Sequence, residues 1–245
     1  MARMQRLSGA DWPHLVVQRA HEGQAIVRDD ADVAMLLGTL KEAAREELVA
    51  VHAYVISIDH FHLLATPSTD DGLSRMVQSV GRRYVAAHNR RHDRQGGLWS
   101  GRYRCTVIEA ARYLLDAMVF VEQHALRVGD AQHLGEDRWS SVGHHLGLRA
   151  DPLIQDHPLF WALGNTPFER EAAWRRRLEE GLSSKKVAEL SNAMHKGWAL
   201  GSDEFLQKVQ ASVGRHVQPK PRGRPRKQVS PASEAPEQGT PLEKQ

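Results

Sequence analysis

The strongest constraint on the fold is the order of short β-type and longer α-type segments in the first half of the chain. Short runs rich in β-branched and aromatic residues are typical of strands, and longer runs with apolar residues at helical spacing are typical of helices. We expect strands at 14–20, 49–57, 60–67 and 101–109, and helices at 29–48, 71–92 and 110–126. The order β-α-β-β-α-β-α predicts an α+β fold, an antiparallel sheet of split βαβ (ferredoxin-like) topology with its helices packed on one face.

The pattern of apolar residues changes near residue 150. Short helical patterns separated by turns follow, and they predict a small α-helical extension. Six of the eleven prolines then fall in residues 217–245 together with Ser, Gln and Glu, a composition typical of disorder. We therefore expect a first domain over 1–149, a helical extension over 150–215 and a disordered basic tail over 216–245.

Several classes of protein are disfavoured by composition. No apolar run approaches the roughly 18 residues that a membrane span requires, and the N-terminus lacks the apolar core of a secretion signal. The single cysteine, Cys105, excludes an internal disulfide framework and fits a reducing compartment. We expect a cytoplasmic protein with no membrane partner.

Positive charge is concentrated between residues 82 and 104, although the net charge of the chain is only +3. Seven arginines stand there against one acid, Asp93, and Tyr84, Trp99 and Tyr103 are interleaved with them. Arginine bonds two phosphate oxygens at once and stacks on bases. The alternative is a solvated basic helix face. The pattern predicts nucleic-acid binding by Arg82, Arg83, Arg90, Arg91, Arg102 and Arg104.

Two histidines stand one residue apart in the expected strand 60–67. Side chains at i and i+2 of a strand share a face, so His60 and His62 project together and Phe61 points into the packed side. Neutral imidazole is a common transition-metal ligand. The pair is therefore either half of a metal shell or two packing histidines.

A longer ordered series of residues resembles a known family. The series is His60-Phe61-His62, then Asn89 to His92, Trp99, and Gly101 to Tyr103. It resembles the single-tyrosine transposases of the HUH superfamily, especially the REP-associated and insertion-sequence types. The likeness runs from Trp12 to Gly129, and "GWALGSDEFL" (197–206) is similar to a C-terminal segment of longer members.

The resemblance implies a definite chemistry. In the family, two histidines and a polar residue of the last helix hold magnesium or manganese, which polarises a phosphate of single-stranded DNA. A tyrosine on that helix attacks, leaving a 5′-phosphotyrosine and a free 3′-OH, and the strand can then be rejoined elsewhere in DNA transposition. The resemblance also implies binding of DNA hairpins, often as a homodimer.

The chain departs from the family at the nucleophile. That position falls on Phe120, which has no hydroxyl. Tyr113 faces the same way on an ideal helix but is displaced by about 10.5 Å along the axis, so it is a poor substitute. His124, one turn after Phe120, falls where the family places its third ligand, which predicts a shell of His60, His62 and His124. The alternative is an exposed histidine favoured by the helix dipole.

Two functions therefore compete. One is a transposase-like enzyme that cleaves and transfers single strands, and the other is a catalytically silent DNA-binding protein or regulator of the same fold. Phe120 separates them and favours the second.

The basic tail carries a further DNA-binding pattern. Residues 220–227, "KPRGRPRK", contain the Arg-Gly-Arg-Pro core of an AT-hook. An extended Arg-Gly-Arg segment suits the narrow minor groove of AT-rich duplex DNA. A generic basic linker is the alternative. The candidate contacts are Arg222, Arg224 and Arg226.

Overall fold

The computed structural model describes residues 6–219, and the elements follow the expected order. The strands are β1 His14–Arg19, β2 Val49–Ile56, β3 His60–Pro67 and β4 Arg104–Val107. The helices are α1 Asp30–Glu46, α2 Gly72–Arg91, α3 Ala110–Glu122, α4 His124–Val128, α5 Val142–His145, α6 Pro158–Trp161, α7 Pro167–Glu180, α8 Ser184–Lys196 and α9 Asp203–Val213. Strand β4 is shorter than expected, and the expected helix 110–126 is divided at Gln123.

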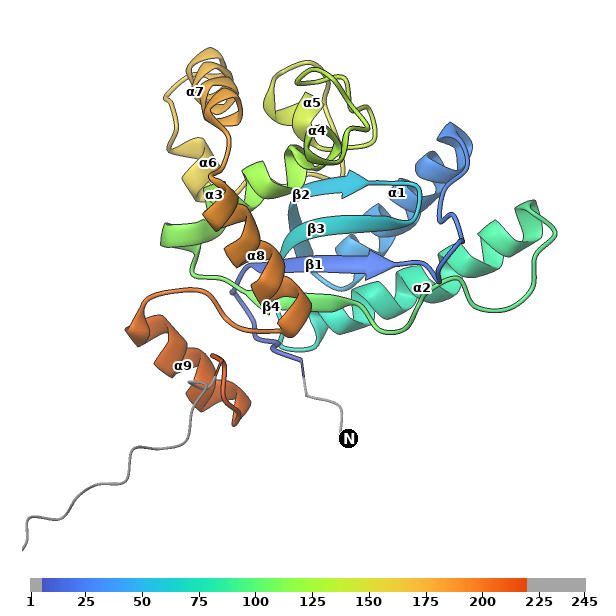
Figure 1. The fold of residues 1–245 in the computed structure, drawn as a ribbon, viewed down its shortest axis with the longest axis horizontal. Coiled ribbons are helices and arrows are strands. Elements are labelled where there is room, and N and C mark those ends of the chain that lie inside the picture. The colour runs from blue at the N-terminus through green and yellow to red at the C-terminus, as the bar shows by residue number, and fades with distance from the viewer. Residues whose placement is uncertain (1–5, 220–245) are drawn as a thin grey trace, which may run out of the picture.

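The strands form one antiparallel sheet in the order β2-β3-β1-β4. Strand β3 lies between β1 and β2, and β1 lies between β3 and β4, so each βαβ unit has another strand inserted between its own two (Figure 1). This arrangement confirms the α+β class and the split βαβ topology.

Helices cover both faces of the sheet. Phe61, Leu63 and Ala65 of β3 pack in one core cluster with α1 and α2, whereas Leu64 packs in a second cluster with α3. The expectation that the helices pack on one face is therefore wrong, because α3 lies opposite α1 and α2. Strand β3 is apolar at both odd and even positions, a pattern typical of a strand buried on both faces.

The C-terminal extension covers the open edge of the sheet. Leu200 forms a parallel bridge with Ile108, just beyond β4, and its N–H donates to the carbonyl of Val107 at 2.9 Å. In the opposite direction, the N–H of Glu109 donates to the carbonyl of Leu200 at 2.8 Å. An edge strand exposes unpaired backbone groups, and this segment pairs part of them.

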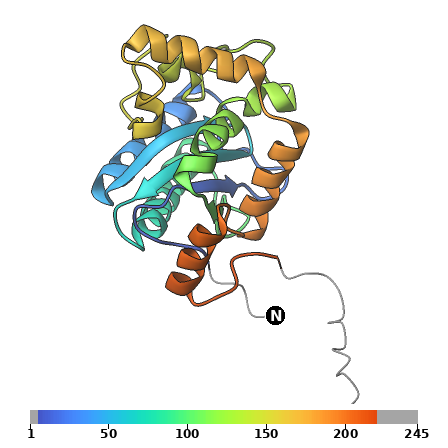
Figure 2. The same cartoon turned by 90° about the vertical axis from the view of Figure 1, so that its left-hand side faces the viewer.

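Helices α6, α7 and α8 of the extension pack on the second face of the sheet. Trp174 of α7, with Leu190 and Met194 of α8, belongs to the core cluster that contains Leu15 and Leu64 of the sheet. Figure 2 shows α7 lying across one end of the sheet, with α8 running along its side and α9 below it. The extension therefore completes the hydrophobic core on the side that carries α3.

The chain is described as far as residue 219. Val217 is 1% exposed and packs with α9 residues Leu206 and Val209, so packed structure reaches into the segment assigned above to the tail. The AT-hook-like segment, with Arg222, Arg224 and Arg226, lies outside the described residues. Among those that are described, no helix is long and apolar enough to cross a membrane.

Candidate metal centre

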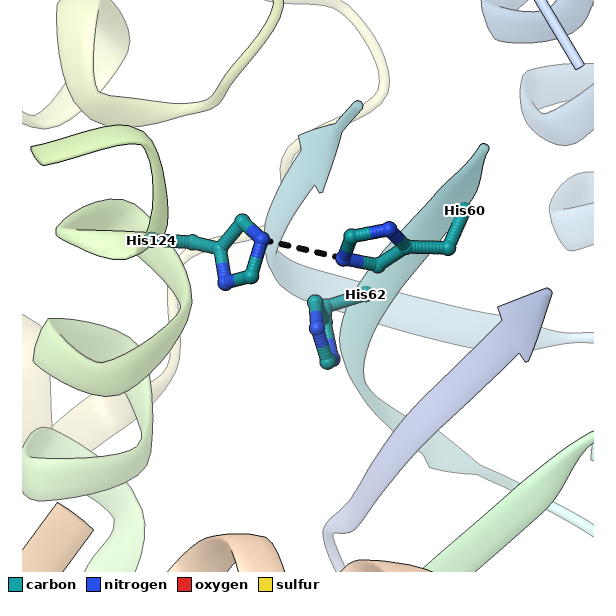
Figure 3. A group of neighbouring side chains, drawn as sticks. All are labelled: His60, His62 and His124. Carbon is teal, nitrogen blue, oxygen red and sulfur yellow. Dashed lines mark hydrogen bonds between the residues drawn. The ribbon is translucent and has the colours of Figure 1, made fainter. Parts of the chain in front are cut away.

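Three histidines converge between β3 and α4. His60 and His62 share one face of β3, and His124 is the first residue of α4. The Nε2 atoms of His60 and His124 are 2.9 Å apart, and one ring nitrogen of each histidine lies within 4.8 Å of the other two. All three side chains are buried, and Figure 3 shows their rings gathered around a common point. The tertiary structure thus brings together the three residues that the sequence nominated.

An acid behind the centre orients the His60 ring. The Nδ1 of His60 lies 2.5 Å from Oδ1 of Asp59, and Arg19 donates to Oδ2 of Asp59 at 2.6 Å. Because a carboxylate accepts hydrogen bonds, Nδ1 carries the proton and the lone pair of neutral His60 lies on Nε2, which faces His124. A carboxylate behind a histidine is the usual support of a metal ligand.

Burial keeps the three imidazoles neutral. Desolvation lowers the pKa of His60, lowers that of His62 well below its usual value, and lowers that of His124 to about 3. The positive charge of Arg127 lowers the pKa of His62 and His124 further. A neutral imidazole offers a lone pair to a cation, so the three rings are ready to act as ligands.

The donors fit a divalent cation. Nδ1 of His62 is buried and has no hydrogen-bond partner among the described residues, and an unpaired buried polar group costs about 1–3 kcal/mol. The 2.9 Å between the two Nε2 atoms is close to the ~3.0 Å expected for two nitrogens bound at right angles, each ~2.1 Å from one ion. A cation bound between the three rings would give Nδ1 of His62 a partner and would account for the short distance between the two Nε2 atoms.

Two other groups of histidine and acid in the described chain fit a cation less well. Beside α1, the carboxylate of Asp32 already accepts hydrogen bonds from Arg91 and His92. Beside α5, the N–H of Asp151 donates to Nδ1 of His144 at 3.1 Å. The lone pair of neutral His144 is therefore occupied and its Nε2 carries the proton. The histidines of β3 and α4 are the preferred centre.

Phe120 faces this centre. Its ring centroid lies 5.9 Å from that of His62, and the guanidinium of Arg127 stacks 4.5 Å from the centroid of the Phe120 ring. Arg127 also donates to the carbonyl of Phe120. The residue at the expected nucleophile position is therefore placed beside the histidines but brings only a hydrocarbon ring.

Arg127 is a site residue that the sequence analysis missed. Burial lowers its pKa to about 10, and its Nη1 has no hydrogen-bond partner in the described part of the chain. The available signal was its spacing, because Arg127 follows His124 by three residues and Phe120 by seven, which places all three on one helical face. A buried donor without a partner beside three histidines suits an anionic group.

Tyr113 is engaged elsewhere. Its hydroxyl donates to Oε1 of Glu189 on α8 at 2.8 Å, and Nζ of Lys186 lies 4.4 Å from the centroid of its ring. Desolvation and the bond to Glu189 raise the pKa of Tyr113 to about 12, which opposes ionisation to a nucleophile. Its contacts therefore fasten α8 to α3.

The six arginines nominated from the sequence form two groups. Arg83 pairs with Glu46 at 2.6 Å and Arg91 pairs with Asp29 at 2.7 Å, so both are neutralised by residues at α1. Within residues 6–219 no carboxylate pairs with the other four, and all of them are exposed: Arg82, Arg90, Arg102 and Arg104. These four are available to a polyanion.

Comparisons with known proteins find similarity to transposases. Residues 12–124 match the family model described as "Transposase IS200 like". The solved structure of a REP-associated tyrosine transposase bound to a REP hairpin has the same fold, with a TM-score of 0.50 and 14% sequence identity over 64% of this chain and 92% of that one. A candidate transposase from Deinococcus radiodurans R1 is 24% identical over 47% of this chain and 89% of that one, with a TM-score of 0.32. No curated protein sequence matches.

Proposed function

Residues 12–124 form a transposase domain of the IS200-like family, and from that premise we propose that this chain binds hairpin DNA beside a His60–His62–His124 metal site without forming a phosphotyrosine. The solved REP-associated transposase of the same fold holds a REP hairpin, which supports DNA of that kind as the ligand. The contact between Phe120 and His62 carries the proposal, because the side chain that faces the histidines lacks a nucleophilic oxygen.

The residues of the centre have separable roles in this proposal. His60, His62 and His124 hold the cation, and Asp59 keeps the lone pair of His60 directed at it. A divalent cation, when bound, supplies polarisation of a phosphate oxygen. Arg127 donates to the same phosphate through its unpartnered Nη1. Three imidazoles suit manganese better than magnesium, which prefers oxygen ligands.

Two further parts of the proposal concern the oligomeric state and the basic tail. We expect a homodimer, as the family resemblance implies, and sedimentation at two protein concentrations tests it. The tail residues Arg222, Arg224 and Arg226 are proposed to contact AT-rich duplex DNA. Loss of AT preference in Arg224→Ala, measured by gel shift against GC-rich duplex, distinguishes an AT-hook from a basic linker.

The deciding experiment compares the unmodified protein with Phe120→Tyr. Each is incubated with labelled hairpin DNA and Mn²⁺ and resolved on native and denaturing gels. We expect the unmodified protein to shift the hairpin without cleaving it, and Phe120→Tyr to give a covalent protein–DNA band. Phe168→Tyr is the matched control, because it adds the same hydroxyl at an exposed site on α7.

Two results would contradict the proposal in different ways. A covalent band from the unmodified protein that disappears in Tyr113→Phe would show that Tyr113 attacks. Cleavage without a covalent band would show a nuclease that uses water as the nucleophile.

A further inference from the structure

His88, near the end of α2, is buried without a hydrogen-bond partner on either ring nitrogen. The residue is 0% exposed, and neither its Nδ1 nor its Nε2 has a partner among the described residues. No other buried histidine within residues 6–219 leaves both ring nitrogens unpaired. Because burial of an unpaired polar group is unfavourable, the ring of His88 is a candidate ligand for a group that the chain itself does not supply.

His92 lies four residues after His88 and shares its helical face. The N–H of His92 donates to the carbonyl of His88 at 3.0 Å, so the helical geometry of α2 continues as far as His92. The centroids of the two rings are 4.5 Å apart. Two histidines four residues apart on a helix can bind one metal ion, and this spacing is common in zinc sites.

Asp32, in the first turn of α1, brings a carboxylate to the two histidines. The residue is 0% exposed, and one ligand atom of each of Asp32, His88 and His92 lies within 4.8 Å of the other two. Two histidines and one carboxylate are a common set of protein ligands for zinc. We call these three residues the α1–α2 cluster.

The hydrogen bonds of Asp32 make this cluster a weaker cation site than the histidine centre of β3 and α4, but they leave room for an ion. Arg91 donates to Asp32 and also to both oxygens of Asp29, at 2.8 and 2.7 Å, so two carboxylates share its charge. Nε2 of His92 lies 2.8 Å from Oδ2 of Asp32. A tetrahedral ion ~2.1 Å from each of these atoms would hold them ~3.4 Å apart, which requires a shift of about half an ångström.

We propose that Asp32, His88 and His92 bind a divalent transition-metal ion of the zinc type, which fastens the end of α2 to the start of α1. The ion replaces the proton between Asp32 and His92, which is released to solvent, and gives His88 the partner that it lacks. Water supplies the fourth ligand, since 12% of the His92 side chain is exposed. The inference goes beyond the proposed function, because neither DNA nor the histidine centre takes part in it.

The test counts the Zn²⁺ bound to the full chain, which is first stripped with a chelator, then loaded with Zn²⁺ and dialysed. The variants are His88→Phe, which keeps an aromatic ring in the core, and His92→Gln, whose amide still donates to Asp32. The matched controls are His133→Phe and His133→Gln, because the side chain of His133 is 78% exposed. His60→Ala, alone and combined with His88→Phe, separates Zn²⁺ bound at the histidine centre from Zn²⁺ bound at the α1–α2 cluster.

We expect His88→Phe and His92→Gln each to bind one equivalent of Zn²⁺ less than the unmodified protein, and both His133 variants to bind as much as it does. The loss in His60→Ala/His88→Phe should be the sum of the losses in the two single variants. Zn²⁺ at about one hundred times its dissociation constant should raise the midpoint of thermal unfolding by roughly 5–10 °C through this cluster. His88→Phe should lose this part of the shift.

Three results would overturn the inference. Equal Zn²⁺ in His88→Phe and the unmodified protein would leave His92 as the protonated partner of Asp32, with no metal between them. A loss in only one of the two cluster variants would contradict a site built from both histidines. An equal loss in the His133 variants would show adventitious binding to surface histidines. If circular dichroism shows that His88→Phe does not fold, the comparison of His92→Gln with His133→Gln decides the question.

Discussion

At the scale of single residues, the contacts of Phe120 and Asp59 bear on the two parts of the proposed function, the absence of a nucleophile and the presence of a metal site. Phe120 faces His62 without a hydroxyl, whereas Asp59 still holds His60 in the orientation that a metal ligand needs. A carboxylate that fixes a histidine ring in this way is the usual support of a metal ligand. The expected consequence is a protein that binds cations without attacking DNA.

Replacing Asp59 with Asn tests this reading. The amide cannot accept the Nδ1 proton of His60 as strongly, and loss of such a support typically costs 10–100-fold in metal affinity. We expect a loss of about that size for Asp59→Asn, measured by titration of Mn²⁺ monitored by its paramagnetic resonance signal. His133→Ala removes an exposed histidine and should leave the affinity unchanged. Equal affinity in Asp59→Asn and the unmodified protein would mean that the cation binds elsewhere.

At the scale of elements, the junction between α3 and α4 is held by α7. Glu122, the last residue of α3, accepts a hydrogen bond from Nε1 of Trp174 on α7 at 2.9 Å. Gln123, between the two helices, donates to the carbonyl of Leu178, also on α7. Because His124 begins α4 directly after this junction, α7 determines where the third histidine lies.

Substitution of Trp174 should therefore affect both stability and the centre. Trp174→Phe leaves an oxygen of Glu122 unpaired at a cost of about 1–3 kcal/mol, and Trp174→Ala should cost about 3–5 kcal/mol by opening a cavity. Chemical denaturation measures the loss of stability in each of the two variants. Trp161→Ala, on α6 and 52% exposed, is the control and should change stability by less than about 1 kcal/mol. A small effect of Trp174→Ala would show that α7 is not part of the folded core.

At the scale of the whole molecule, a network of charged side chains joins the residues that match the transposase family model to the extension. His145 of α5 lies 2.5 Å from Glu122 through Nδ1 and 3.3 Å from Asp156 through Nε2. Although burial opposes it, the charges of Glu122 and Asp156 raise the pKa of His145 to about 9. The protonated ring therefore links α3, α5 and the segment before α6.

This network predicts a pH dependence of stability. The pKa of His145 in the folded state is above the 6.5 of an ordinary histidine, so its contribution is complete below about pH 6.5 and is lost as the pH rises through about 9. The contribution is at most ~3 kcal/mol, from a shift of about 2.5 units at 1.36 kcal/mol each. The free energy of unfolding of the unmodified protein should therefore fall as the pH is raised from about 6.5 to about 9.

The variant His145→Gln isolates that contribution. It should be less stable than the unmodified protein near pH 6, and the difference should shrink toward pH 9, because only the unmodified protein loses a proton in this range. His133→Gln, at an exposed histidine, should follow the unmodified protein throughout. A difference that stays constant with pH would show that His145 is neutral in the folded state.

The local patterns of the sequence were sufficient for most elements of the first half of the chain and for the shared face of His60 and His62. Strand and helix periodicity placed β1, β2, β3, α1 and α2 to within two residues, since their cores are regular and apolar. The spacing of His60 and His62 alone put them on one face of β3. These features depend on neighbours in the chain and need no knowledge of distant contacts. The roles expected of Phe120 and His124 came from the family resemblance.

Contacts between distant segments decided the rest. Helices on both faces of the sheet and the pairing of Arg83 and Arg91 with acids at α1 follow from packing that no local pattern encodes. Arg104 and Lys196 are the clearest case, because they line one cleft only when the extension packs along the edge of β4. The sequence by itself determined which side chains have the chemistry for this protein's function, and the tertiary structure decided which of them share a site, since that depends on how buried apolar surfaces pack.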